Sequence, residues 1–484
     1  MKKKILAAAT AAVMIASAVP MVNAETTEKQ INVMLNGDYV SFTQQAPANI
    51  NDRVLVPIRD VMEKMGAKVD WNDADQSITV TRDDVTVGLK VNDANITVNN
   101  ETKTLDVAPQ IINDKTLLPI RAVAEAFGCT VGWDDTAKTV IIVNVDDYLN
   151  EIKKNSSNFY TFASEQSSMI ADMYSSTMTG SFKIKVESKA EGKADNFDLG
   201  FDISSEGTSK NDNNEDKTVI KINAGSLTKI LKDLGLEIGD VDLSKLDEVN
   251  IETKVIGKDI YVKTDLVKKL TEVTSDKKVA AAAVLVTENT WLKIDIESLI
   301  KSIPNAEGAD QFADYIDAVA SAAQDGKNVI DSIADFAKGM EYNSIVTAEM
   351  VNSVAETFSG MYNDNNFKYS KTDDGYTVSF TMTNDQYVDY VKAQWESEGI
   401  QMPENALDGL DINMSMNVTG DKNGNSKSDV DMTYKVNSKI DDDNYVNMDM
   451  SFKINAETKA VDSADDVTAP EGAIDLSKLL DIMK

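Results

Sequence analysis

The chain has 484 residues, and its 48 lysines and arginines against 80 aspartates and glutamates give a formal net charge of −32. So large a negative charge opposes binding to nucleic acid and to anionic lipid surfaces. Histidine is absent, which excludes Ser-His-Asp and Cys-His catalysis and nearly all copper and catalytic zinc sites, and the single cysteine excludes an intramolecular disulfide.

The first 24 residues have the pattern of a secretory signal peptide. Lysines at 2–4 precede an apolar run over 5–18, and Val22 and Ala24 supply the small residues of a cleavage site. The run is too short to span a bilayer comfortably, and no later segment reaches transmembrane length. We therefore expect cleavage after Ala24 and a secreted mature protein. If it associates with the cell wall, we expect the association to be non-covalent.

Residues 51–73 and 113–135 repeat one another at an offset of 62 positions. The matched residues of the first copy are Leu55, Pro57, Ile58, Arg59, Val61, Glu63, Gly66, Val69, Trp71 and Asp73. Their partners in the second copy are Leu117, Pro119, Ile120, Arg121, Val123, Glu125, Gly128, Val131, Trp133 and Asp135. Each copy predicts a strand, a short helix, a strand, a turn and a second strand.

Local chemistry supports this prediction. Proline is favoured at the first helical position because its missing N–H is not needed there. The second copy then has an apolar stripe at helical spacing, formed by Ile120, Val123, Ala124 and Phe127. Gly128 ends the helix, and Cys129, which replaces Ala67 of the first copy, is expected to be a small buried residue.

The stretches upstream of the two copies also resemble each other. An Asn-Gly pair at 36–37 and an Asn-Asn pair at 99–100 each predict a hairpin turn. We interpret residues 31–145 as two interlocked α+β units built from antiparallel strands.

This duplicated pattern resembles the copper amine oxidase N-terminal-like domain, also called the stalk domain, which is common in secreted proteins of Gram-positive bacteria. The repeated L-x-P-I-R…G…V-x-W spacing carries the resemblance. It implies a small antiparallel sheet wrapped around a helix, acting as a surface or spacer module. It does not imply the oxidase reaction, which resides in another domain and needs three histidine ligands and a tyrosine in an Asn-Tyr-Asp/Glu context. Here Asn444-Tyr445 is followed by Val446.

Arg59, Trp71, Arg121 and Trp133 have two interpretations. Each arginine lies in a first helical turn, where it opposes the helix dipole, and the glutamate four residues on can compensate by an ion pair. The alternative is a recognition surface for a cell-wall polymer, with the guanidinium stacked on the indole ring.

The remaining chain changes character twice. Residues 146–178 predict one or two amphipathic helices that join the modules. Alternation typical of half-buried strands then dominates over 180–188, 197–204, 250–264, 290–299, 411–418, 429–436 and 445–454. Helical periodicity interrupts it over 226–235, 310–340 and 347–361, and the longest apolar run, 279–286, suits a buried element.

This layout, with its closing stretch over 467–480, resembles the curved half-barrel of LolA- and LppX-type lipoprotein carriers. No site motif is shared, so the resemblance implies no residue-level function. Five methionines of facing strands would line one patch: Met414, Met416, Met432, Met448 and Met450. Methionine adapts to irregular apolar shapes, so this patch is a candidate face for a lipid or other apolar ligand. The alternative is that it packs against the helices.

Residues 421–429 begin like a calcium loop, but Ser426 replaces the required glycine and Met432 the final acid. A hairpin turn at Asn423-Gly424 is the better interpretation.

Together these patterns predict an α+β protein. A duplicated small antiparallel-sheet-plus-helix module over 31–145 and a helical linker over 146–178 precede a large curved antiparallel sheet, covered by a few helices, over 179–484. We expect a secreted, non-catalytic cell-envelope protein without a cofactor or metal, and not a partner of nucleic acid. Its N-terminal module would be a spacer or would dock to a wall polymer or surface protein, and its C-terminal domain would be a binding module. A carrier or sensor of apolar ligands, and a hydrolase using a carboxylate pair, are the alternatives.

Overall fold

The computed structural model describes residues 31–476 with nine gaps, and the described chain forms two compact units. The N-terminal unit contains the described residues up to Lys154 together with Ile333–Ser359. The C-terminal unit contains Asn155–Ser332 and the described residues from Gly360 onward. Both combine helices with largely antiparallel sheets, which confirms the predicted α+β class. The gaps are 170, 191–192, 211–212, 223–245, 257–258, 275–276, 296–327, 398–406 and 442–443.

The two sequence repeats fold alike, as predicted. The first contains β4 (Arg53–Pro57), α2 (Ile58–Lys64), β5 (Lys68–Asn72) and β6 (Ser77–Arg82). The second contains β11 (Lys115–Pro119), α3 (Ile120–Ala126), β12 (Thr130–Asp134) and β13 (Thr139–Val143). The glycine after each helix has a φ of 79°, the left-handed conformation that ends a helix.

The prolines differ slightly from the prediction. Pro57 and Pro119 end their strands and directly precede the helices, instead of occupying the first helical position. Their ψ angles of 113° and 97° are still extended, so each proline belongs to the strand that pairs across the unit. The missing proline N–H is tolerated at such a strand end.

The two copies are interlocked, but not only by antiparallel pairing. β4 pairs antiparallel with β11, with Pro57 opposite Leu117, in the sheet β10–β11–β4–β3. β1 (Asn32–Leu35) instead pairs parallel with β13, with Asn32 opposite Thr139. The prediction of antiparallel strands throughout is therefore wrong at this pair, because the first strand of the unit closes the sheet of the second copy.

The other strands complete these sheets. The predicted hairpins form between β1 and β2 (Asp38–Tyr39) and between β8 (Asn95–Val98) and β9 (Glu101–Thr104). The outer strands of the interlocked sheet are β3 (Ala48–Ile50) and β10 (Gln110–Ile112). The order of the remaining sheet is β5–β6–β7–β8–β9, in which β7 (Val85–Lys90) separates β6 from β8.

One hydrophobic core serves both copies. Val61 and Met62 of the first helix and Val123 and Ala124 of the second are all fully buried in the same cluster. Cys129 lies in this core with 5% of its surface exposed, and burial raises the pKa of its thiol to about 12. It stays protonated and acts as a small apolar residue, as expected.

A late segment of the chain also belongs to the N-terminal unit. α4 (Val145–Asn155) lies there, and so do the end of α11 (Val329–Gly339) and α12 (Ile345–Glu356). Ser344 is the N-cap of α12, and the buried carboxylate of Asp134 accepts the backbone N–H of Ile345, the first residue of this helix, at 3.0 Å. Gly132 faces the backbone of Tyr342, where a Cβ atom would lie 1.6 Å from the carbonyl oxygen.

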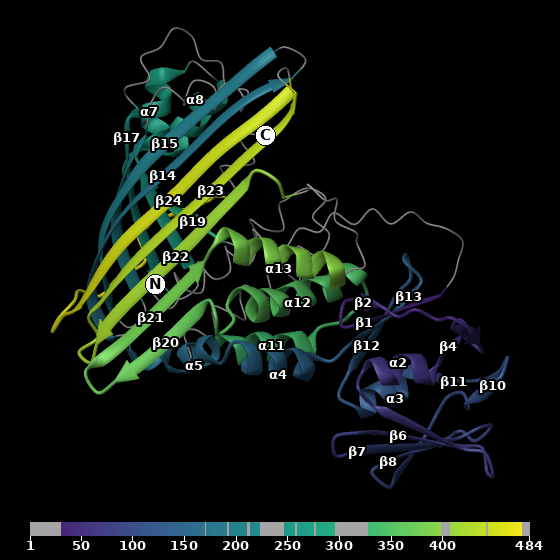
Figure 1. The fold of residues 1–484 in the computed structure, drawn as a ribbon. Helices are drawn as coiled ribbons and strands as arrows, with labels where there is room; N and C mark the ends of the chain where they lie inside the picture. Colours follow the sequence, from purple (N-terminus) through teal and green to yellow (C-terminus); the bar gives the residue numbers. More distant parts are fainter. Residues whose placement is uncertain are drawn as a thin grey trace. The chain divides into compact units, whose positions relative to one another are not determined.

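The C-terminal unit is built on one strongly curved sheet of 12 strands within the described residues (Figure 1). Its order begins β20 (Phe367–Thr372), β21 (Gly375–Met382), β22 (Leu410–Asp421), β23 (Ser426–Asp441), β24 (Asn444–Ala460) and β14 (Met173–Ala190). It continues β15 (Lys193–Lys210), β16 (Asn213–Ile222), β17 (Glu248–Ile256), β18 (Asp259–Thr264), β19 (Leu292–Ile294) and β25 (Ile474–Asp475). All neighbours are antiparallel except β19 and β25. The large curved antiparallel sheet is confirmed.

The predicted alternating segments lie in these strands, with two differences. β19 is short, and Ile296 of its predicted segment lies outside the described residues. The predicted helical linker holds α4, α5 (Ser157–Glu165) and the 3₁₀ helix η1 (Gln166–Met169), but β14 already begins at Met173. Pairing of Met173 with Lys210 draws these residues into the sheet, a long-range contact that local periodicity does not reveal.

The helices match the sequence less well. α12 with the following π-helix η3 (Thr357–Met361) occupies the helix predicted over 347–361, and α11 is the described part of 310–340. The segment 226–235 lies outside the described residues. The apolar run 279–286 forms most of α8 (Lys277–Leu285). The expected burial holds for one side of it, with Val279 and Ala282 buried, whereas Val284 is 81% exposed.

Two helices, α7 (Leu266–Val273) and α13 (Asn384–Ser397), were not predicted. α13 carries a readable signal, because Thr383 and Gln386 form a capping box. The Thr383 N–H donates to Gln386 Oε1 at 2.8 Å, and the Gln386 N–H donates to Thr383 Oγ1 at 3.4 Å. Among the helices of the described ranges, none has the length and apolar composition of a membrane span.

Candidate functional site

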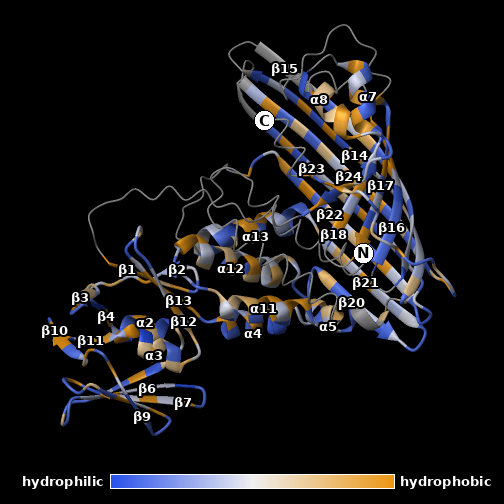
Figure 2. Cartoon of the chain, turned by 180° about the vertical axis from the view of Figure 1, so that it is seen from behind, coloured by the Kyte–Doolittle hydropathy of each residue, from blue (hydrophilic) through white to orange (hydrophobic). Residues whose placement is uncertain are grey.

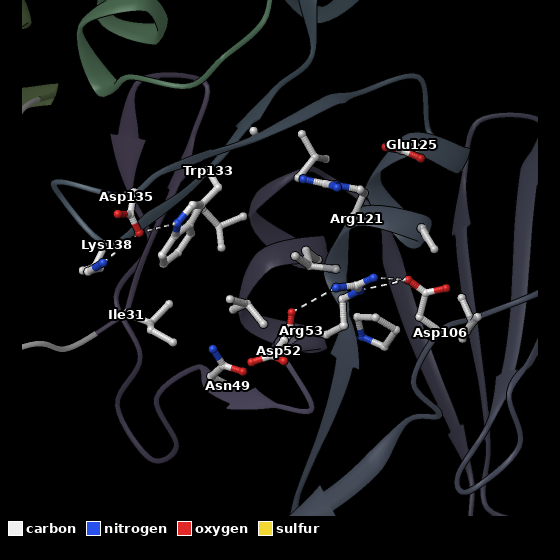
Figure 3. A pocket seen from close by; sticks show the side chains of 18 of the residues that line it. Ile31, Asn49, Asp52, Arg53, Asp106, Arg121, Glu125, Trp133, Asp135 and Lys138 are labelled. Carbon is white, nitrogen blue, oxygen red and sulfur yellow. Dashed lines mark hydrogen bonds and ion pairs between the residues drawn. The ribbon is translucent and has the colours of Figure 1, made fainter.

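The N-terminal unit contains a pocket of about 760 Å³, here called the Arg121 pocket (Figure 3). The second sequence repeat forms one side of it, with Arg121 and Glu125 from α3 and Trp133 from β12. The first repeat contributes Arg53 from β4. The pocket therefore exists because the two copies interlock, and it includes two of the four residues predicted as a recognition surface.

Five polar side chains around the pocket already have partners. Trp133 donates its indole N–H to Asp135 at 3.3 Å, and Asp135 also accepts from Lys138 at 2.8 Å. These hydrogen bonds, that of Lys138 first, lower the pKa of the Asp135 carboxyl. Arg53 pairs with Asp106 at 2.8 Å.

Arg121 and Glu125 of the same pocket differ from these residues, because neither side chain has such a partner among the described residues. The guanidinium of Arg121 makes no hydrogen bond or ion pair with any residue that the structure describes, and its side chain is exposed. The pair predicted between Arg121 and Glu125 is therefore not formed. A guanidinium without a partner offers a fork of donors that fits a carboxylate or a phosphate.

The equivalent arginine and tryptophan of the first repeat both have hydrogen-bonding partners. Arg59 pairs with Glu63 at 2.9 Å, as the structural interpretation predicts. Trp71 is 37% exposed, and its N–H donates to Asp73. Neither Arg59 nor Trp71 lines the Arg121 pocket. The predicted stacking of arginine on tryptophan is found at neither copy among the described residues.

The second candidate is one face of the large sheet. Because directly paired residues of antiparallel strands share a face, the register places side chains together. Met432 pairs with Met414 on one side and with Phe452 on the other, and Phe452 pairs with Phe182. Phe182 stacks on Phe201, with ring centroids 5.0 Å apart. We call this surface the methionine face.

All five predicted methionines share this face. Met450 pairs with Tyr434 and Met448 with Val436, while Met416 extends the face on β22. The five side chains are half-buried, neither enclosed nor open to solvent. The opposite face of the same strands is polar, with ion pairs such as Lys453 to Asp431 at 2.6 Å. Figure 2 shows the alternation of apolar and polar residues along these strands.

The turn that begins like a calcium loop is a hairpin, as predicted. It joins β22 to β23, and Gly424 has a φ of 84°. Asp421 accepts the backbone N–H groups of Asn423 at 2.9 Å and Asn425 at 3.0 Å. Hydrogen bonds, that from the Asn425 side chain first, lower the pKa of the Asp421 carboxyl. The Asp421 carboxylate is therefore already hydrogen-bonded to N–H groups of its own loop.

The acidic stretch 211–217 is typical of a solvated turn, and this expectation is wrong at Asp216. It lies on β16 with 7% of its surface exposed, and its Oδ2 atom has no hydrogen-bond partner among the described residues. Burial raises the pKa of this carboxyl to about 6. The sequence does contain a signal for this burial. Asp216 occupies the same side of the strand alternation as Thr218, Ile220 and Ile222.

Comparison with known proteins confirms the class of the N-terminal module. Residues 34–142 match the family described as copper amine oxidase N-terminal domain. This stretch contains both repeats and the interlocked sheets, so the predicted resemblance is confirmed. The matched family is the N-terminal domain and not the catalytic part of such oxidases.

A particular relative shares this region. The chain is 31% identical over 117 residues to a protein named "Protease inhibitor" from Brevibacillus choshinensis. The match covers 23% of this chain and 34% of the relative, so the chain spans about a third of that protein's length. The name describes the whole relative.

Proposed function

We propose that this protein is an exported, non-enzymatic binding protein of the cell envelope. In this proposal the methionine face binds an apolar ligand, and the N-terminal unit spaces the protein or docks it to a wall polymer. The pattern of a signal peptide over 1–24 supports export. The match to an oxidase N-terminal domain, together with the absence of histidine from the chain, supports a role without catalysis.

The partial burial of the methionine face carries the proposal. Fully burying one large apolar side chain contributes about 1.5–3 kcal/mol, and Met432, Phe452 and Phe182 are each only half-buried. A ligand that covered them would recover part of this free energy. Flexible methionine side chains allow the same face to accept ligands of different shape.

Native mass spectrometry of the purified protein after incubation with a lipid extract tests the binding role. We expect a bound apolar ligand, and Met432→Lys should reduce its occupancy about tenfold or more, because a charge enters an apolar face. Thr433→Lys is the matched control, since the adjacent residue lies on the opposite face. A protein that stays empty in the extract, or equal loss in both variants, would contradict the proposal.

The Arg121 pocket supports docking to a wall polymer as a second role. The Arg121 guanidinium, which has no partner among the described residues, shares this pocket with Trp133, a combination that suits a polymer with carboxylate or phosphate groups and sugar rings. In co-sedimentation with purified cell wall, Arg121→Ala should weaken retention about tenfold. Arg59→Ala removes the equivalent arginine of the first copy, which is engaged by Glu63, and should retain wild-type binding. Equal retention of the two variants would exclude docking through this pocket.

A further inference from the structure

The methionine face carries a single charged side chain over a wide area. The face runs from the row Ser426–Thr458–Ser176–Gly207–Asp216 to the row Val436–Met448–Val186. Between these rows, on the described parts of β22–β24 and β14–β17, Asp216 is the one aspartate, glutamate, lysine or arginine on this face. The lysines near it, such as Lys217 and Lys254, alternate onto the opposite face, where Lys254 pairs with Glu215 at 3.4 Å.

The carboxylate of Asp216 is held toward the middle of its row. A Cβ atom on Gly207 would lie 2.0 Å from Asp216 Oδ1, so the carboxylate lies over the backbone of the neighbouring strand, where glycine leaves room. Asp216 Oδ2 and Thr458 Oγ1 are both buried without a hydrogen-bond partner among the described residues. Ser176 lies between them in the row. The row therefore presents acceptor oxygens that the described chain does not use.

From the row that contains Asp216 toward the row that contains Met448, the face becomes apolar. Ser205 and Thr218, which share a 2.9 Å hydrogen bond, belong to the next row. Beyond them Ile203 pairs with Ile220, and then the stacked rings of Phe182 and Phe201 begin. From Ser176 to Phe182 is six residues along β14, about 20 Å.

A lone buried carboxylate costs free energy unless a positive group pairs with it. We propose that the methionine face binds an amphiphile with a primary ammonium head, which pairs with Asp216, and a long alkyl tail, which lies over Phe182, Phe201 and Met432. This inference rests on the proposed binding of an apolar ligand and names its class. A primary ammonium carries the N–H donors that the acceptor row requires. The distance from the row to the rings suits a long tail.

Dodecylammonium, dodecanol and dodecanoate, each at monomeric concentrations, are the probes. They share one tail and differ in the charge of the head, and isothermal titration calorimetry gives the affinities for the purified protein. We expect dodecylammonium to bind tightest, and Asp216→Asn should weaken it about 30-fold or more, the cost of removing one partner of a buried charge pair. Asp202→Asn, which removes an exposed acid of the opposite face, should leave the affinities unchanged.

The outcomes separate the two proposals. Equal affinity for the three heads, or unchanged affinity of Asp216→Asn for dodecylammonium, would overturn the role of Asp216 but keep apolar binding. Failure of every probe to bind would overturn the proposed function itself. Dodecanol also tests whether the variant is correctly folded, because Asp216→Asn should bind dodecanol with the same affinity as the wild type.

Discussion

Replacing Gly132 with alanine is expected to lower the free energy of unfolding of the N-terminal unit by about 3 kcal/mol or more. The new Cβ atom would lie 1.6 Å from the carbonyl oxygen of Tyr342, and backbone cannot yield as a flexible side chain can. The segment leading to α12 must then leave the unit. Its departure also breaks the hydrogen bond from the Ile345 N–H to Asp134. Urea denaturation, with hydrogen exchange over 342–356, measures both effects.

The sequence repeat supplies a matched control. Asp70 stands in the first copy where Gly132 stands in the second, and it is exposed. Asp70→Ala therefore places the same alanine at the equivalent strand position, and we expect a change within about 0.5 kcal/mol. If Gly132→Ala were as mild as Asp70→Ala, the packing of the late segment on β12 would be refuted.

Asp216→Asn is expected to stabilise the protein at pH 7 by up to about 3 kcal/mol. Burial raises the pKa of the carboxyl from 3.8 to about 6, so the folded state binds a proton more readily than the unfolded state. The contribution of Asp216 to stability therefore improves as the pH falls from about 6 toward 3.8 and is lost above that range. Asparagine imitates the neutral acid, so the advantage of the variant should vanish near pH 4.

Thermal or urea unfolding of both proteins at pH 4 and pH 7 measures this difference. Comparison with the variant cancels the titration of the many other carboxylates. Asp202→Asn serves as the control, because Asp202 is exposed on the opposite face. An Asp216→Asn variant less stable than the wild type at pH 7 would show that the carboxylate is satisfied. Greater stability combined with lost ammonium binding would mark a group kept for binding at a cost in stability.

Local patterns predicted much of the fold. The repeat, its helix-ending glycines and the alternating strands are local features, and the structure confirms them because each depends on neighbours in sequence. The parallel pairing of β1 with β13 and the docking of α12 onto the N-terminal unit were not predictable in this way. Both join residues far apart in the chain. The roles of Gly132 and Asp134 are apparent only in the structure, where Gly132 faces the backbone of Tyr342 and Asp134 accepts the N–H of Ile345.

The candidate sites, too, could be predicted only where they depend on local sequence patterns. Strand alternation alone placed the five methionines on one face, because directly paired residues share a face when the strands are in register. It could not distinguish Arg121, which has no partner among the described residues, from Arg59, which has one, since each arginine has a glutamate four residues further on. Asp216 could not be recognised as buried because the acid-rich stretch around it is typical of a solvated turn, whereas its burial depends on strands distant in sequence.

A crystal structure of the protein with 12-bromododecylammonium tests the central claim most directly, because anomalous scattering locates the bromine. We predict the bromine over the methionine face, near Met432 and Phe182, with the nitrogen within hydrogen-bonding distance of Asp216. Bromine found on the polar face, or at no ordered position in a crystal saturated with the ligand, would contradict the claim that this sheet binds apolar molecules.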